Sequence, residues 1–178
     1  MKFVDYTSIS IKAGDGGDGC IAFLREKFRP KGGPAGGDGG HGGNVYFQVS
    51  SDLSTLSDLN YKKHYFAGDG ENGKGKNMHG KNGEDIFIRV PQGTIVIDSI
   101  TKQVIVDLVK NNQTYKIASG GNGGFGNARF KTQKITAPRI ANNGKKGDSL
   151  KIDLELKVLA DVGLIGLPNA GKSTFISK

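Results

Sequence analysis

The stretch at residues 32–44, GGPAGGDGGHGGN, has a pair of glycines at every third step, and from Gly36 onward it reads GGD, GGH, GGN. Side chains repeat about every 3.6 residues in an α-helix and about every 2 in a β-strand, so neither explains this period. The polyproline II helix does, because it turns about once every three residues and has no internal hydrogen bonds. Two faces of such a helix would be bare backbone, which lets neighbouring segments approach closely and bond through N–H and C=O groups.

Glycine dominates the composition, at 29 of 178 residues, more than twice its usual share of about 7%. The stretches 14–43, 68–83 and 120–126 hold 23 of these glycines. Flexible linkers are the alternative explanation, but the stretches alternate with strand patterns and carry Asp, Asn and His rather than Ser. The short runs and the 5 prolines do not suit a collagen triple helix. We expect several polyproline II segments packed together as one rigid body.

Short alternating or apolar runs between the glycine stretches predict β-strands. The run 86–98 reads as two strands joined by a Pro-Gln-Gly turn, and 52–63 is the best candidate for a short helix. The expected strands are 3–11, 20–24, 44–49, 85–90, 94–97, 103–109, 114–118 and 149–156. This pattern favours a mainly β fold, a small barrel or sandwich, with the glycine segments projecting from one end.

A phosphate-loop motif, G-x-x-x-x-G-K-S, follows an apolar strand pattern at 162–165 and precedes a helix start, which is the context it requires. Backbone N–H groups of such a loop cradle phosphates. Lys172 would reach the β- and γ-phosphates, and the Ser173 hydroxyl would ligate Mg²⁺. The expected nucleotide-binding residues are Gly166, Leu167, Pro168, Asn169, Ala170, Gly171, Lys172, Ser173 and Thr174. They do not distinguish GTP from ATP.

Neither a D-x-x-G nor an N-K-x-D motif occurs in the chain. One strand and one helix turn also cannot bury a core. We therefore expect a glycine-rich domain over 1–157 and the beginning of a truncated α/β nucleotide-binding domain over 158–178, as the front of a longer parent protein. Nucleotide hydrolysis is expected of the parent and not of this chain alone.

Basic and aromatic residues gather beside the glycine stretches, and the net charge is +8. Lys and Arg neutralise phosphates, and Phe or Arg planes stack on unpaired bases, so a shared tip would suit RNA. Ordinary solubilising charge is the alternative. The candidate RNA-binding residues are Arg25, Lys27, Arg29, Lys31, His79, Lys81, Arg129, Lys131 and Arg139.

Other classes of function find little support. The single Cys20 excludes an intramolecular disulfide and fits a reducing compartment. The chain start does not resemble a signal peptide, and no apolar run is long enough to span a bilayer. We therefore expect a cytoplasmic protein, or one that has lost its targeting segment. We also expect a monomer. His41 and His79 are too isolated to suggest a metal site, and the glycine-rich part has no nucleophile–base pair.

Together these residues resemble the Obg (CgtA) family of GTPases. The resemblance follows nearly the whole chain in order, through 23–45, 80–96, 120–130 and 155–174. It implies the Obg fold, a β-barrel base with polyproline II helices followed by a GTPase domain that binds GTP or GDP with Mg²⁺. It also implies binding to the large ribosomal subunit and its rRNA near the peptidyl transferase region, with roles in late subunit assembly and in stress-linked control of translation. Asn122 and Ala128 depart from the family pattern, which often has a basic residue and His there.

Two questions stay open at this level. In the Obg-like pattern N-A-G-K-S, the Asn169 amide oxygen would suit K⁺ beside the phosphates, or Asn169 only shapes the turn. A stand-alone, non-catalytic RNA-binding module is the alternative to a GTPase. Nucleotide binding distinguishes these two classes.

Overall fold

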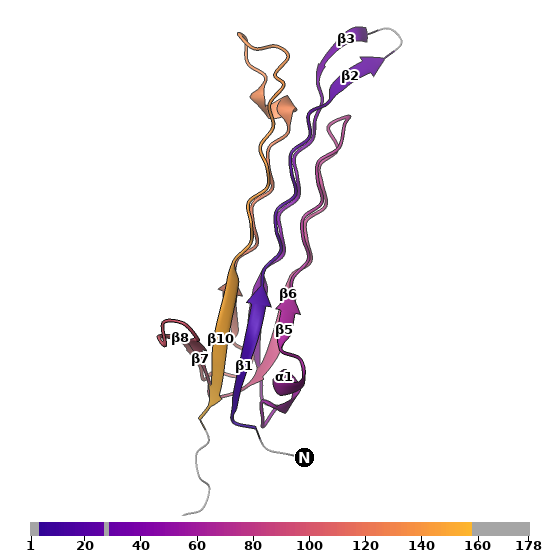
Figure 1. Ribbon diagram of the computed structural model, residues 1–178. Helices are drawn as coiled ribbons and strands as arrows, with labels where there is room; N and C mark the ends of the chain where they lie inside the picture. Colours follow the sequence, from indigo (N-terminus) through magenta and orange to yellow (C-terminus); the bar gives the residue numbers. More distant parts are fainter. Residues whose placement is uncertain (1–3, 27–28, 158–178) are drawn as a thin grey trace, which may run out of the picture.

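The computed structural model describes residues 4–26 and 29–157. Figure 1 has a β-sheet base at one end, from which long extended segments rise. The elements are β1 (Tyr6–Lys12), β2 (Phe23–Glu26), β3 (Arg29–Pro34), β4 (Val45–Ser50), α1 (Ser57–Tyr61), β5 (His64–Phe66), β6 (Ile86–Pro91), β7 (Thr94–Asp98), β8 (Val104–Leu108), β9 (Thr114–Ala118), the 3₁₀ helix η1 (Asn127–Phe130) and β10 (Ser149–Leu156). The phosphate loop Gly166–Thr174 lies outside the described residues, so the division at residue 157 stays a prediction.

The base consists of two sheets around one apolar core. A five-stranded sheet has the order β5-β1-β10-β7-β8, and a three-stranded sheet has the order β6-β4-β9. Strand alternation turns every second residue inward, so Ile9 of β1 meets Ile152 of β10 in register, and both join Phe47 and Ile88 of the other sheet in the core. The mainly β fold predicted from the short strands is confirmed.

The strands differ from the prediction at a few places. The run 86–98 forms two strands as predicted, but β6 pairs with β4 and β7 pairs with β10. Gly93, with φ of +83°, makes the turn that carries the chain from one sheet to the other. Strands β3 and β5 were not predicted, because the first contains two glycines and two prolines and the second has only three residues. The helix expected at 52–63 is confined to Ser57–Tyr61.

The chain leaves the base three times, each time rising from one strand and returning to another. The six extended segments that result are called the glycine bundle: 13–20, 35–44, 67–73, 78–85, 119–126 and 142–148. Their hydrogen bonds recur at every third residue, as polyproline II geometry requires. Gly14, Gly17 and Cys20, for example, donate their N–H groups to the carbonyls of Gly43, Gly40 and Gly37 at 2.9–3.0 Å.

Both glycine faces of the GGX triplets point inward. A Cβ on Gly36 or Gly39 would overlap the carbonyls of Cys20 or Gly17, and a Cβ on Gly37 or Gly40 would overlap those of Met78 or Lys81. Glycines three residues apart therefore share a face, as the period predicts. Each face is covered by the backbone of a different neighbouring segment, which no side chain can displace.

The third residue of each triplet also has a bonding role, which the sequence analysis missed. Its N–H group donates to a side-chain acceptor on a neighbouring segment. The donors Asp38, His41 and Asn44 bond to the acceptors His79 Nδ1, Asn82 Oδ1 and Asp85 Oδ1 at 3.1, 2.8 and 2.6 Å. Asp, Asn and His recur here because their side chains are short and offer an acceptor at the distance of the next segment.

Candidate nucleic-acid interface

Three connections close the end of the glycine bundle farthest from the base, and together they are called the tip: the β2–β3 hairpin at 23–34, the turn at 74–77 and the segment 127–140. Their roots are bonded to one another. Asn77 donates its N–H to Ala35 O at 2.8 Å, and Asn127 donates to Cys20 O at 3.0 Å. Each of the three connections carries basic residues: the turn at 74–77 has Lys74 and Lys76, and the other two carry candidate RNA-binding residues.

Asn127 fastens these roots and is completely buried. Its Oδ1 accepts the N–H of Gly36 at 2.8 Å, and its Nδ2 donates to the carbonyls of Ala22 and Pro138 at 3.0 and 3.1 Å. One amide thus ties together chain segments more than a hundred residues apart. Sequence reasoning missed it because an Asn beside glycines also suits an exposed turn.

The candidate RNA-binding residues fall into two groups. Lys131 and Arg139 lie exposed on the tip. Arg25, Arg29 and Lys31 belong to the hairpin strands β2 and β3, and only their backbone is described; Lys27 lies outside the described residues. The hairpin and the 127–140 segment are thus the two parts of the tip on which most of the candidates stand.

His79, Lys81 and Arg129 already have protein partners. The Arg129 Nε donates to Asp38 Oδ2 at 2.6 Å, and its guanidinium lies 4.6 Å from the centre of the Phe125 ring. Lys81 Nζ lies 3.5 Å from a carboxylate oxygen of Glu84, an exposed pair that contributes little to stability. Because Arg129 bonds to the buried Asp38, it is part of the scaffold as well as of the basic surface.

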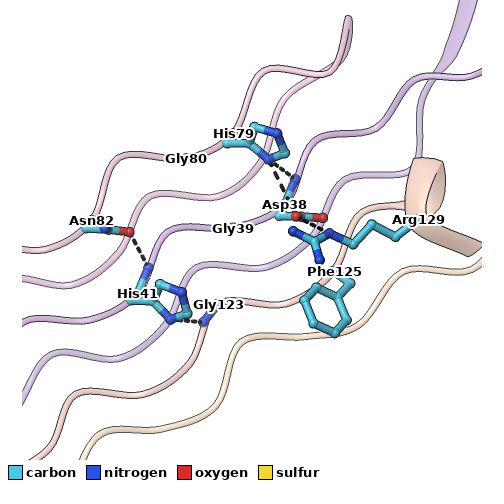
Figure 2. A pocket seen from close by; sticks show the side chains of 9 residues that line it. All are labelled: Asp38, Gly39, His41, His79, Gly80, Asn82, Gly123, Phe125 and Arg129. Atoms are coloured by element: carbon cyan, nitrogen blue, oxygen red, sulfur yellow. Dashed lines mark hydrogen bonds and ion pairs between the residues drawn. The ribbon is translucent and has the colours of Figure 1, made fainter.

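A hollow of about 250 Å³ opens on the glycine bundle, lined by residues 38–41, 79–82 and 123–129, next to the tip. Figure 2 shows how Asp38 and His41 of one segment face His79 and Asn82 of another across it, with Phe125 and Arg129 on the third side. Asp38 is the buried member, with its carboxylate bonded to Gly126 N and to Arg129. The other side chains stand at the rim and are exposed to solvent.

Among the residues that the structure describes, no group of His, Cys, Asp or Glu is arranged to hold a metal ion. Within the same residues, no helix has the length and apolar character needed to cross a membrane. The features that stand out in the described part are therefore the basic tip and the hollow next to it.

Comparison with known proteins gives one consistent answer. The family model GTP1/OBG matches residues 4–158. A GTPase Obg of Aquifex aeolicus is 60% identical over 177 residues, covering 99% of this chain and 52% of that protein. Those of Chlorobaculum parvum and Anoxybacillus flavithermus are 56% and 55% identical, covering 99% and 98% of this chain and 53% and 41% of those proteins. The chain spans about half the length of the curated relatives it matches.

Proposed function

The chain belongs to the GTP1/OBG family, and from that premise we propose that it is the front part of a ribosome-associated GTPase whose tip contacts RNA of the large ribosomal subunit. In that role the protein would act in assembly of the subunit or in stress-linked control of translation. The observation that carries the proposal is that three basic connections meet at the end of the glycine bundle, which forms a narrow shaft.

The architecture of the shaft suits entry into a narrow cleft. Backbone packs on backbone throughout the glycine bundle, so the shaft is slim for its length. Its hydrogen bonds run between segments and not within them, so each segment is held by its neighbours. A rigid shaft of this kind brings charged side chains to a buried RNA surface without a large ordering cost on binding.

Nucleotide chemistry is proposed for the full-length protein. Its loop 166–174 would bind GTP or GDP, Ser173 would hold Mg²⁺, and Asn169 would offer an oxygen to K⁺. This chain by itself is proposed not to hydrolyse GTP, since it carries a single nucleotide motif. Lys172→Ala in the full-length protein should abolish tight GTP binding by calorimetry, because it removes the charge at the β- and γ-phosphates.

The tip is tested by sedimentation of the 178-residue chain with purified large ribosomal subunits across a salt series. Lys131→Glu and Arg139→Glu should each weaken binding and lower the salt slope by roughly 0.7 for each lost phosphate contact. Lys63→Glu is the matched control, because it makes the same charge change on an exposed residue of the base. It should leave the slope near that of the unmodified chain.

Circular dichroism checks that all three variants are folded. Equal losses of affinity for the tip and base variants would mean that net charge alone drives association. Unchanged affinity and slope for both tip variants would remove the tip as the RNA contact.

A further inference from the structure

The hydrogen-bond acceptors of the hollow are already used within the protein. His79 Nδ1 accepts the N–H of Asp38 at 3.1 Å, and His41 Nδ1 accepts the N–H of Gly123 at 3.3 Å. Asn82 Oδ1 accepts the N–H of His41 at 2.8 Å. The Asp38 carboxylate accepts from Gly126 N and Arg129 Nε. His41, His79 and Asn82 therefore have their acceptors turned toward the backbone of the glycine bundle. The Asp38 carboxylate also faces side chains, since it bonds to Arg129 and lies 3.6 Å from His79 Nδ1.

The hydrogen-bond donors of the same side chains are left for a ligand. A neutral imidazole that accepts through Nδ1 carries its proton on Nε2, so His41 and His79 each present an N–H away from the backbone they cap. Asn82 has its amide NH₂ group, and Arg129 has its terminal guanidinium N–H groups. In the described part of the chain, no acceptor is bonded to any of these donors. Hydrogen-bond donors that line one hollow and have no protein acceptor suit an anion with several oxygens.

The choice of histidine at two capping positions supports the same reading. Elsewhere in the glycine bundle the capping side chain is Asp or Asn, as at Asp69, Asn72 and Asp85. Capping therefore needs only a short side chain with an oxygen acceptor. A histidine does this and adds a second nitrogen beyond the cap, and both capping histidines line the hollow.

We propose that this hollow binds a phosphate group of single-stranded RNA, held by the Nε2–H groups of His41 and His79 together with the Arg129 guanidinium. The choice of RNA as the source of the phosphate rests on the proposed function, since the hollow lies next to the tip. Phe125, a residue that is 44% exposed, forms the side wall where the attached nucleotide would lie. The volume of about 250 Å³ exceeds what a phosphate alone fills.

The test follows the three histidine rings of the 178-residue chain by NMR, during titration with inorganic phosphate and separately with hexauridylate. His64 is the internal reference, because it lies in the base, with its ring stacked on Phe66. The Nε2 and Hε1 signals of His41 and His79 should shift together and saturate with both ligands, while those of His64 stay fixed. This measurement needs no variant and so does not depend on one that folds.

The matched variant is the double substitution His41→Asn and His79→Asn. Asn keeps an acceptor for each backbone N–H and removes the Nε2–H donor. Affinity for hexauridylate should fall about tenfold or more, because each lost hydrogen bond to a charged group is worth about that factor. Protection of the Gly123 amide from hydrogen exchange should be retained, and His64→Asn should leave the affinity unchanged.

The outcomes separate the hollow from the tip. If the His41 and His79 signals stayed fixed while subunit binding was still sensitive to Lys131→Glu, the phosphate site in the hollow would be disproved and the proposed function would remain in place. Ring shifts with hexauridylate, without any subunit binding, would uphold the hollow and overturn the proposed function. Shifts with inorganic phosphate alone would exclude RNA as the source of the phosphate and so overturn the inference. Equal hexauridylate affinity for the double variant and the unmodified chain would overturn it too.

Discussion

The base and the glycine bundle alternate along one chain, yet different interactions hold them together. In the base, side chains such as Ile9, Phe47 and Leu154 are almost fully buried against one another, so burial of apolar surface is the main stabilising term. In the glycine bundle, the faces in contact are backbone, and the recurring interactions are hydrogen bonds between segments. Contacts between side chains therefore hold the base together, whereas contacts between backbone atoms hold the glycine bundle together.

This difference sets what each region tolerates. A hydrophobic core adjusts to modest changes of side-chain volume, since neighbouring side chains repack. A carbonyl in the glycine bundle cannot move aside without breaking hydrogen bonds on both of its neighbours. We therefore expect the glycine bundle to be intolerant of the smallest possible addition, one methyl group, and the base to be sensitive to changes of charge and polarity in its interior.

The largest effect should come from Gly39→Ala, in the middle of the glycine bundle. The added methyl would overlap the carbonyl of Gly17, which belongs to the neighbouring segment. We expect the free energy of unfolding to fall by about 4 kcal/mol or more. This exceeds the usual cost of overpacking a core, because backbone atoms have to move. Hydrogen exchange should detect it as lost protection of the Gly17 amide, which is bonded to Gly40 O.

Gly75→Ala is the matched control. The nearest atom to its added methyl would be the Ala22 Cβ at 3.4 Å, an ordinary van der Waals contact. Its stability should change by less than about 1 kcal/mol. Amides of β1 and β10 in the base should stay protected in both variants. Equal tolerance of the two substitutions would contradict the close packing of the glycine bundle.

A smaller effect is expected at Asp153, a buried carboxylate on β10 of the base. It accepts hydrogen bonds from Lys102 Nζ at 2.8 Å, from Ser8 Oγ, and from Ser99 Oγ at 2.7 Å. These partners hold the pKa of Asp153 well below its usual range, the Lys102 bond contributing most. Asp153→Asn should lower the free energy of unfolding by about 2 kcal/mol at neutral pH, since it removes the charge that these donors face.

The pH dependence of that cost has a definite sign. A carboxyl group with a lower pKa in the folded state stabilises the fold above its unfolded pKa of about 3.9 and loses this contribution as the pH falls toward the folded value. Urea unfolding at several pH values should therefore find the largest difference between Asp153→Asn and the unmodified chain near neutrality. The difference should shrink below about pH 4. A difference independent of pH would mean that shape, and not charge, matters at this position.

The glycine period predicted much of the glycine bundle because the cause is local. Two glycines in every three residues dictate an extended helix with two bare faces, and the pairing of Gly36 with Gly39 and of Gly37 with Gly40 follows from the period alone. The glycine spacing of 68–83 is less regular than that of 36–44 because the turn at 74–77 divides the region into two segments that run in opposite directions. The alternation of apolar residues is also a local feature, and it predicted most strands of the base for the same reason.

What the sequence did not reveal depends on partners that are far away along the chain. The sequence predicts Arg129 as an RNA contact but gives no sign that its Nε is bonded to Asp38, 91 residues away. Asn127 and the capping side chains at Asn82 and Asp85 gave no signal of their own, since their partners are backbone N–H groups of other segments. The hollow follows from these distant contacts, so it became visible only in the folded chain.

The smallest effect should come from the capping side chains, and it measures how much they add to glycine packing. Asp69 Oδ1 accepts the N–H of Asp15 at 2.7 Å at an exposed position. In Asp69→Ala only water can accept a hydrogen bond from that N–H. We expect the free energy of unfolding to fall by about 1 kcal/mol, which is similar to the effect of removing a helix N-cap. Asp69→Asn retains an acceptor and should cost almost nothing, which separates the hydrogen bond from the charge. The Asp15 amide should exchange faster in Asp69→Ala alone. If the Ala and Asn variants were equally stable, glycine packing and backbone hydrogen bonds would hold the bundle without the caps, and the recurrence of Asp, Asn and His in the triplets would need another cause.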